Sequence, residues 1–207
     1  MSAGNFVGGL ASRHVELNVK LAGCKTVAEI EALVRSTRFE GRLSVVNIAT
    51  AVHRLARAAR AAAGPGGASQ VAVSKERSAA LAFQLHKRFV QLLGHEEMRA
   101  SVDTRTWANM SWAVAKLLLP AEPVFHCAAA AVAVASGTGA DARPQELSNI
   151  AWAFATRPIT NAPLVESIGL KAASTPSEFT PQHLANICWA LARVLRPRAA
   201  DGGGGPA

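Results

Sequence analysis

The 207-residue chain is long enough for one or two domains with a sizeable buried core. Half of it is hydrophobic, yet aromatics make up only 5% and tyrosine is absent. This composition excludes a disordered chain and favours helices packed through small side chains over a β-sheet. The formal net charge of +8 favours a polyanionic partner, the alternative being an ordinary soluble basic protein from a GC-rich genome, where arginine and alanine are common. The excess is concentrated early, with nine Lys and Arg against four acids in residues 1–60 and eight against seven in residues 101–207.

Apolar periodicity and helix breakers predict an all-α chain. Residues 1–15, which lack acids and carry Arg13, are expected to be an N-terminal extension with a faint likeness to a transit peptide. A helical-repeat domain follows over residues 16–195, and the Gly-rich residues 196–207 are expected to be a disordered tail. Thr26 and Glu29 predict a capping box at the first repeat helix. Helix pairs are predicted near 26–60, 74–118, 124–156 and 161–195.

One helix of each pair contains the same motif, centred on Asn47, Asn109, Asn149 or Asn186. Counting from the Asn, apolar residues recur at −2, +1, +5 and +8, and positions +2 and +6 are mostly small. Steps of three and four describe one helix face, and small residues permit close approach of a neighbour. Single pairs cannot bury these faces, so the repeat predicts a short α-solenoid of about four stacked helix-turn-helix repeats. The four Asn-centred helices should be adjacent and roughly parallel.

The motif is clearest in Pro-Gln-Glu-Leu-Ser-Asn-Ile-Ala-Trp-Ala-Phe-Ala (144–155) and Pro-Gln-His-Leu-Ala-Asn-Ile-Cys-Trp-Ala-Leu-Ala (181–192). It resembles the octotricopeptide and heptatricopeptide repeats of algal, dinoflagellate and apicomplexan organellar proteins. The resemblance covers roughly residues 16–195. It implies a solenoid that acts on organellar RNA, in stability, processing or translation, or within an organellar ribosome. Proteins of this class often end in a RAP domain, and only the Gly-rich stretch follows the last repeat here.

The four repeat asparagines are candidate RNA contacts, because asparagine is a poor residue for a helix interior. Seven residues after each Asn, close to the same face, stand Arg54, Lys116, Thr156 and Arg193. Amide and cation could then meet a base edge and a phosphate. The alternative is that the asparagines cap or cross-link neighbouring repeats in a hydrogen-bond ladder, and this alternative is favoured.

Two further sets of side chains suggest nucleic-acid contacts. Trp112, Trp152 and Trp189 recur at position +3 and could stack on bases. A tryptophan at fixed phase is more often packed between repeats, so we expect all three to be largely buried. The other set is a basic cluster, which could instead be a solvated face; we expect any RNA affinity to reside mainly in this N-terminal half. The cluster comprises Arg35, Arg38, Arg42, Arg54, Arg57 and Arg60.

The sequence contains no phosphate-binding Gly-rich loop, no nucleophile elbow and no paired carboxylates at helical spacing, so we expect a protein that is not an enzyme. No cofactor or metal is expected, because the three cysteines are scattered and lack ligand spacing, and no segment is apolar for long enough to insert in a membrane. The function expected is organellar RNA binding, in a mitochondrion in preference to a plastid, with RNA (rRNA included) and other proteins of an organellar complex as partners. The alternative is a structural subunit of a large organellar assembly. The candidate RNA-binding residues are Arg35, Arg38, Arg42, Asn47, Arg54, Arg57, Arg60, Asn109, Lys116, Asn149, Asn186 and Arg193.

Overall fold

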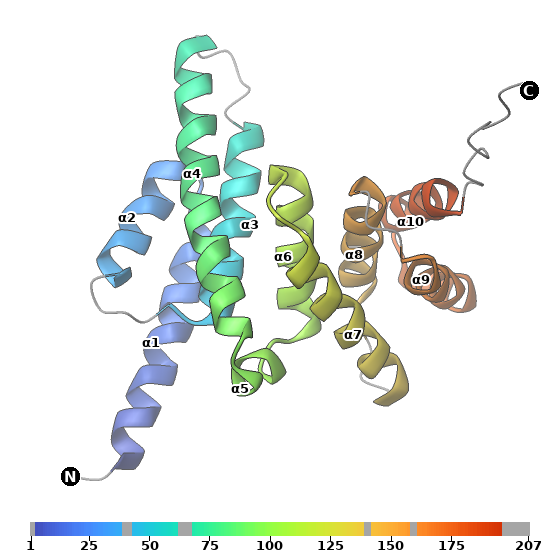
Figure 1. Cartoon of the computed structure of the whole chain (residues 1–207), viewed down its shortest axis with the longest axis horizontal. Coiled ribbons are helices and arrows are strands. Elements are labelled where there is room, and N and C mark those ends of the chain that lie inside the picture. Colours follow the sequence, from blue (N-terminus) through green and yellow to red (C-terminus); the bar gives the residue numbers. More distant parts are fainter. Residues whose placement is uncertain (1–2, 39–42, 62–67, 139–141, 158–160, 196–207) are drawn as a thin grey trace, which may run out of the picture.

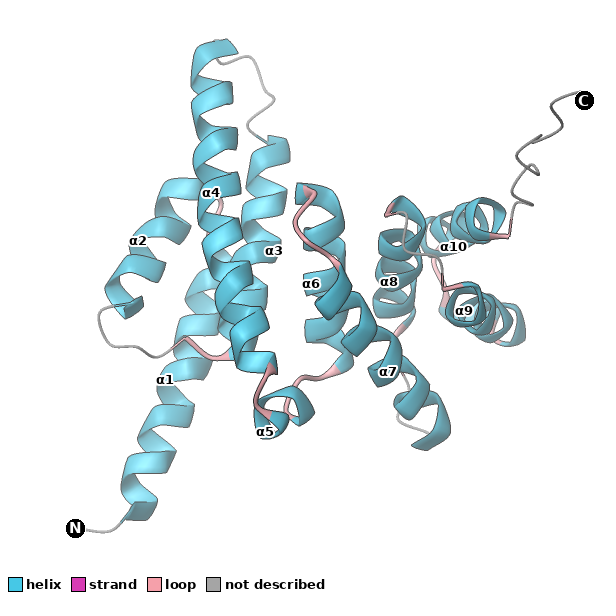
Figure 2. Cartoon of the chain, viewed as in Figure 1, coloured by secondary structure: helices cyan, strands magenta, loops and turns pink. Residues whose placement is uncertain are grey.

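The computed structural model describes residues 3–38, 43–61, 68–138, 142–157 and 161–195. All regular structure within these residues is helical, which confirms the all-α prediction for them (Figure 2). In chain order the helices are α1 (Ala3–Gly23), α2 (Val27–Arg38), α3 (Val45–Ala61), α4 (Ala68–Leu93), α5 (Glu96–Ala100), α6 (Thr104–Leu117), α7 (Glu122–Thr138), α8 (Pro144–Thr156), α9 (Ala162–Ser174), the 3₁₀ turn η1 (Pro176–Glu178) and α10 (Pro181–Val194).

Side-chain caps fix where several of these helices begin. At α2 the predicted capping box is present, because Glu29 N–H donates to Thr26 Oγ1 (3.2 Å) and Thr26 N–H donates to a Glu29 carboxylate oxygen (3.3 Å). At α6 an Asp103 carboxylate oxygen accepts from Thr106 N–H at 2.8 Å. Each cap satisfies N–H groups that have no partner inside the helix.

The helices form two rows (Figure 1). In the first row, α1, α3, α6, α8 and α10 contact one another in that order. In the second row, α2 and α4 pack on α3, α7 packs on α6, and α9 packs on α8 and α10. The predicted pairs 74–118 and 124–156 therefore differ from the observed packing, in which α4 and α7 contact the Asn-centred helix that precedes them in the chain. The predicted adjacency of the four Asn-centred helices is confirmed. Their predicted parallel course holds for α3, α6 and α8, whereas α10 is inclined to α8 and is viewed nearly end-on in Figure 1.

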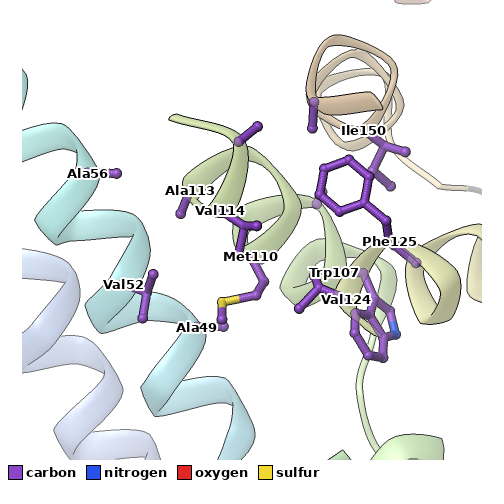
Figure 3. Packing of buried hydrophobic residues seen from close by; sticks show 14 of the residues in the cluster. Ala49, Val52, Ala56, Trp107, Met110, Ala113, Val114, Val124, Phe125 and Ile150 are labelled. Carbon is purple, nitrogen blue, oxygen red and sulfur yellow. The ribbon is translucent and has the colours of Figure 1, made fainter. Parts of the chain in front are cut away.

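The interior of the first row is built from small and medium side chains. Between α3 and α6, Ala49 and Val52 face Met110 and Val114, and all four are buried (Figure 3). The small residues at positions −1, +2 and +6 are buried throughout α6 and α8, where a following helix covers them. The equivalent residues of α10, at the end of the described row, are exposed: Ala185, Cys188 and Ala192.

The first helix of the row, α1, was not predicted. Leu17, Leu21 and Cys24 are buried at steps of four and three, and α1 packs on α3. The expected boundary at residue 15 between extension and repeat domain therefore falls inside a helix. Three glycines among the first nine residues obscure the helical pattern in the sequence. The short α5 was not predicted either.

A leucine in left-handed backbone geometry ends α6. Leu118 has φ 56° and ψ 32°, and among the described residues it alone combines a side chain with positive φ. The next residue, Leu119, is buried, and its N–H donates to the carbonyl of Val114 at 3.0 Å, which closes the last turn. Leu118 itself is 72% exposed, so its side chain contributes little packing to offset the strain.

Replacing Leu118 by Gly should therefore raise the free energy of unfolding by up to about 1 kcal/mol, because glycine adopts this conformation without steric cost. Urea denaturation would measure the change. The control is Leu118→Ala, which removes the same exposed apolar surface but keeps Cβ, and it should show no such gain. Equal stability of the two variants would contradict the strain.

Candidate nucleic-acid interface

The packing of the first row leaves one stripe of each Asn-centred helix uncovered. In α6, eight of the fourteen residues are buried. The residues that remain accessible include Arg105 and Lys116, which are exposed, and Asn109 and Trp112, which are half-buried. These residues are at −4, 0, +3 and +7, and their steps of three and four place them on one helix face. We call this face, continued on α8 and α10, the outer stripe. It comprises Arg105, Asn109, Trp112 and Lys116; Gln145, Asn149, Trp152 and Thr156; and Gln182, Asn186, Trp189 and Arg193.

The three repeat tryptophans lie on this stripe and are less buried than predicted. Trp112 and Trp152 are half-buried, and Trp189 is 43% exposed. The prediction of large burial is therefore wrong for Trp189 and only partly met by the other two. The reason is their phase: position +3 is at the edge of the buried face. Trp107, at position −2 of α6, is 2% exposed and is the tryptophan that the core encloses.

Aromatic rings connect three helices along the stripe. The His53 ring of α3 lies edge-on to Trp112 with ring centroids 5.1 Å apart, and Trp112 is 6.3 Å from Trp152. Cations accompany these rings. Lys116 Nζ lies 5.9 Å from the Trp152 centroid, and Arg193 Cζ lies 5.5 Å from that of Trp189. Both distances fall within the range of a cation–π contact.

Positive charge is concentrated on the row that carries the stripe. The four Asn-centred helices hold six Lys and Arg, three in α3, two in α6 and one in α10, against one acid, Glu146 in α8. Glu146 is buried and accepts from Arg143 N–H at 3.1 Å, so its charge is held at the helix start. The second row holds seven cations against five acids: two and two in α2, four and one in α4, none and one in α7, and one of each in α9.

The described ion pairs all lie away from the stripe. Glu31 of α2 pairs with Arg35 and, at 2.6 Å, with Arg77 of α4. The third pair joins Lys20 and Glu16 within α1. Arg35 therefore belongs to an exposed ion-pair chain on the second row and does not join the other predicted cations. Within the described residues, no acid pairs with the cations of the stripe.

His53 lies among three guanidinium groups. Burial, with the nearby charges of Arg57, Arg54 and Arg105, lowers the pKa of His53 to about 4. The imidazole is therefore neutral at pH 7 and serves as an aromatic surface for Trp112. Arg57 and Arg105 are exposed. Arg54 is half-buried, and its Nε has no hydrogen-bond partner.

Asn47 is a structural residue. It is 1% exposed, its Nδ2 donates to the His14 carbonyl at 2.9 Å, and its Oδ1 accepts from Ser44 Oγ at 2.9 Å. The His14 ring also contacts its Oδ1 through Nδ1, at 3.1 Å. Asn47 has no surface left for an RNA base, so its assignment as an RNA contact is corrected. The unpredicted helix α1 is the physical reason, because it covers this residue.

The other three asparagines differ in how far their amides are occupied. Asn186 Nδ2 donates to Ser148 Oγ of α8 at 3.2 Å, and its Oδ1 accepts from Gln182 at 3.0 Å. This contact is one rung of the hydrogen-bond ladder that the sequence suggested. Asn149 Oδ1 accepts from Gln145 at 2.9 Å. Asn109 is half-buried at the equivalent position in α6.

Some predicted cations cannot be placed. Arg42 lies outside the described residues, as do the side chains of Arg38 and Arg60. Conversely, the sequence reasoning missed the residues at position −4, Arg105, Gln145 and Gln182. The Pro-Gln that begins two copies of the motif (144–145 and 181–182) was the available signal, since counting four residues back from the Asn places the glutamine on the same face.

Comparison with known proteins adds no relative: no family model matches this chain, and neither a curated protein nor a solved structure is significantly similar to it. Among the described residues, no three His, Cys, Asp or Glu side chains gather as a metal site would require. None of the described helices combines the length and apolarity needed to cross a bilayer.

Replacing Asn47 by Ala should lower the free energy of unfolding by about 1–3 kcal/mol, because it leaves the half-buried partners His14 on α1 and Ser44 without these hydrogen bonds. Asn109→Ala is the matched control on the next repeat. It should change stability by no more than about 0.5 kcal/mol, because the site is half-exposed and alanine suits a helix better. Urea denaturation of both variants tests this, and equal losses would contradict the distinction.

Acidification should reveal the burial of His53. Below pH 6.5 the unfolded chain binds a proton that native His53 does not accept until about pH 4. Stability should therefore fall between these pH values, by on the order of 3 kcal/mol from this residue. Burial also lowers the pKa of His86, which adds in the same direction.

Thermal or urea unfolding across pH 4–7 would measure this effect, with His53→Phe expected to show a shallower loss than the parent. Replacing the exposed His126 by Gln is the control and should leave the profile as in the parent. A His53→Phe profile parallel to that of the parent would refute the assignment.

Proposed function

We propose that this chain is an RNA-binding helical-repeat protein of an organelle, a short α-solenoid that presents its outer stripe to RNA. The observation that carries the proposal is the coincidence of unpaired cations and half-exposed aromatic rings on the same stripe. Phosphates attract such cations, and this attraction provides most of the sequence-independent affinity of nucleic-acid-binding proteins.

The distribution of charge supports a polyanion over an acidic protein patch of small extent. Arg57, Lys116 and Arg193 are exposed on α3, α6 and α10, so three of the four Asn-centred helices present a cation, and α8 between them presents none. This spacing suits an extended ligand that crosses several helices. It also changes the expectation from the sequence, since affinity should not be confined to the N-terminal half.

The organelle, and the mitochondrion before the plastid, rest on the resemblance of the repeat motif alone. The roles implied there are stabilisation, processing or translation of an organellar RNA. We retain one alternative, a scaffolding subunit of a large organellar assembly such as a ribosome. The small extent of the stripe favours this alternative. Three tryptophans on three helices give few positions for reading a long RNA sequence.

The direct test is binding of a fluorescently labelled single-stranded RNA, measured by anisotropy over a range of salt concentrations. Arg57→Ala, Lys116→Ala and Arg193→Ala, combined in one variant, should weaken binding. Each lost phosphate contact flattens the dependence of log K on log salt by about 0.7, so the slope should fall by roughly two units for the three cations.

The matched control combines Lys75→Ala, Lys87→Ala and Arg88→Ala, three exposed cations of the second-row helix α4. It removes the same net charge from the other row and should retain most of the affinity. Equal weakening of both variants would indicate a net-charge effect. If neither variant weakens binding, the cations of the stripe do not contact RNA. The scaffolding alternative is then favoured, and co-sedimentation with a protein assembly would test it.

A further inference from the structure

The four tryptophans fall into two groups that differ in their exposure to solvent. Trp107 is enclosed between α6 and its neighbours and meets the Phe89 ring edge-on with ring centroids 5.8 Å apart. Trp189 leaves 43% of its surface exposed, and Trp112 and Trp152 are half-buried. Packing accounts fully for Trp107. Trp112 and Trp152 pack against the core on one side, but packing does not account for the ring surface that stays exposed at the same phase of three helices, which is largest at Trp189.

The rings of Trp152 and Trp189 each lie under the side chain of a long cationic residue. Lys116 and Arg193 are exposed and extend over Trp152 and Trp189 at 5.9 and 5.5 Å from the ring centroids. Neither cation is held by an acid within the described residues. Long flexible cations of this kind can leave a ring for a phosphate oxygen when another planar group takes their place.

The asparagines are poorly placed to read base edges. Both polar atoms of the Asn186 amide are bonded to protein, and Asn149 Oδ1 is occupied by Gln145. An amide committed on both sides cannot form the paired contact by which asparagine identifies a base. On α8 and α10 the rings therefore provide the more available surface.

Building on the proposed function, we infer that the outer stripe binds single-stranded RNA by stacking nucleobases on Trp189 and Trp152, with Arg193 and Lys116 moving from the rings to the adjacent phosphates. A duplex cannot bind in this way because its base faces are already stacked on one another. Every base offers an aromatic face, so binding should tolerate changes of sequence.

The three rings should contribute unequally. Trp112 lies between His53 and Trp152, with ring centroids 5.1 and 6.3 Å away, so its surface is the most occupied. Trp152 has Trp112 on one side and Lys116 nearby. Trp189 has only the Arg193 contact among the described ring interactions. The expected order of contribution is Trp189, then Trp152, then Trp112.

The test compares two strands with the same number of phosphates, one a mixed-sequence RNA and one an abasic strand of equal length. The parent should bind the RNA more tightly than the abasic strand, and the RNA should quench tryptophan fluorescence. Trp189→Leu should weaken RNA binding by roughly tenfold, the usual size for one stacked base, while binding to the abasic strand and the salt slope stay unchanged. Trp189→Phe keeps an aromatic face and should recover most of the loss.

Circular dichroism confirms that the variants fold, and a double-stranded RNA competitor should displace the RNA poorly. If the parent binds RNA and the abasic strand equally and Trp189→Leu leaves both unchanged, stacking is overturned while the proposed function stands. Competition by duplex as effective as by single strand also overturns stacking. If the parent binds neither strand, the proposed function itself fails.

Discussion

The close approach of first-row helices through small side chains is the constraint on which the rest of the molecule depends. Ala151 and Ala155 in α8, like Ser111 and Ala115 in α6, are buried where the next helix covers them. Small residues let two helix backbones come near enough for their larger neighbours to interdigitate, as protein interiors require. Met110 and Val114 of α6, for example, fill the space against Ala49 and Val52 of α3. Both lateral surfaces of α6 and α8 are thereby covered, and one narrow face of each remains for solvent.

That remaining face carries the partly exposed tryptophans and the cations of the outer stripe. A tryptophan at the edge of a buried face packs against the protein on one side and is exposed to solvent on the other. Aromatic residues adopt this arrangement at binding surfaces. Few acids share this face: Glu122 and Glu166 lie on α7 and α9, and Glu146 of α8 is buried. A near-neutral sequence segment can thus present a positive surface, since charge is sorted by row and not by position along the chain.

Much of the fold could be predicted from sequence because the motif repeats. Its apolar steps located α3, α6, α8 and α10, and breakers and caps located α2, α4, α7 and α9. The site was harder to predict, since periodicity defines a face but not what covers it. Asn47 and Asn109 occupy the same phase, and only the packing of α1 on α3 makes one of them buried and the other half-exposed. The cluster of arginines was likewise divided between rows, with Arg35 on α2 and Arg57 on α3.

The order of contacts along the first row also determines which helices unfold locally and which unfold only in larger units. Helix α6 joins α3 to α8, whereas α10 is held by α8 and α9 and leaves its small residues uncovered. Stability in such a row is close to a sum over neighbouring helices, so opening begins at the least-covered end and a break in the middle releases both halves. Amide protons of α10 should therefore exchange with solvent through small local openings, and those of α6 only through openings that divide the chain into two separately moving bodies.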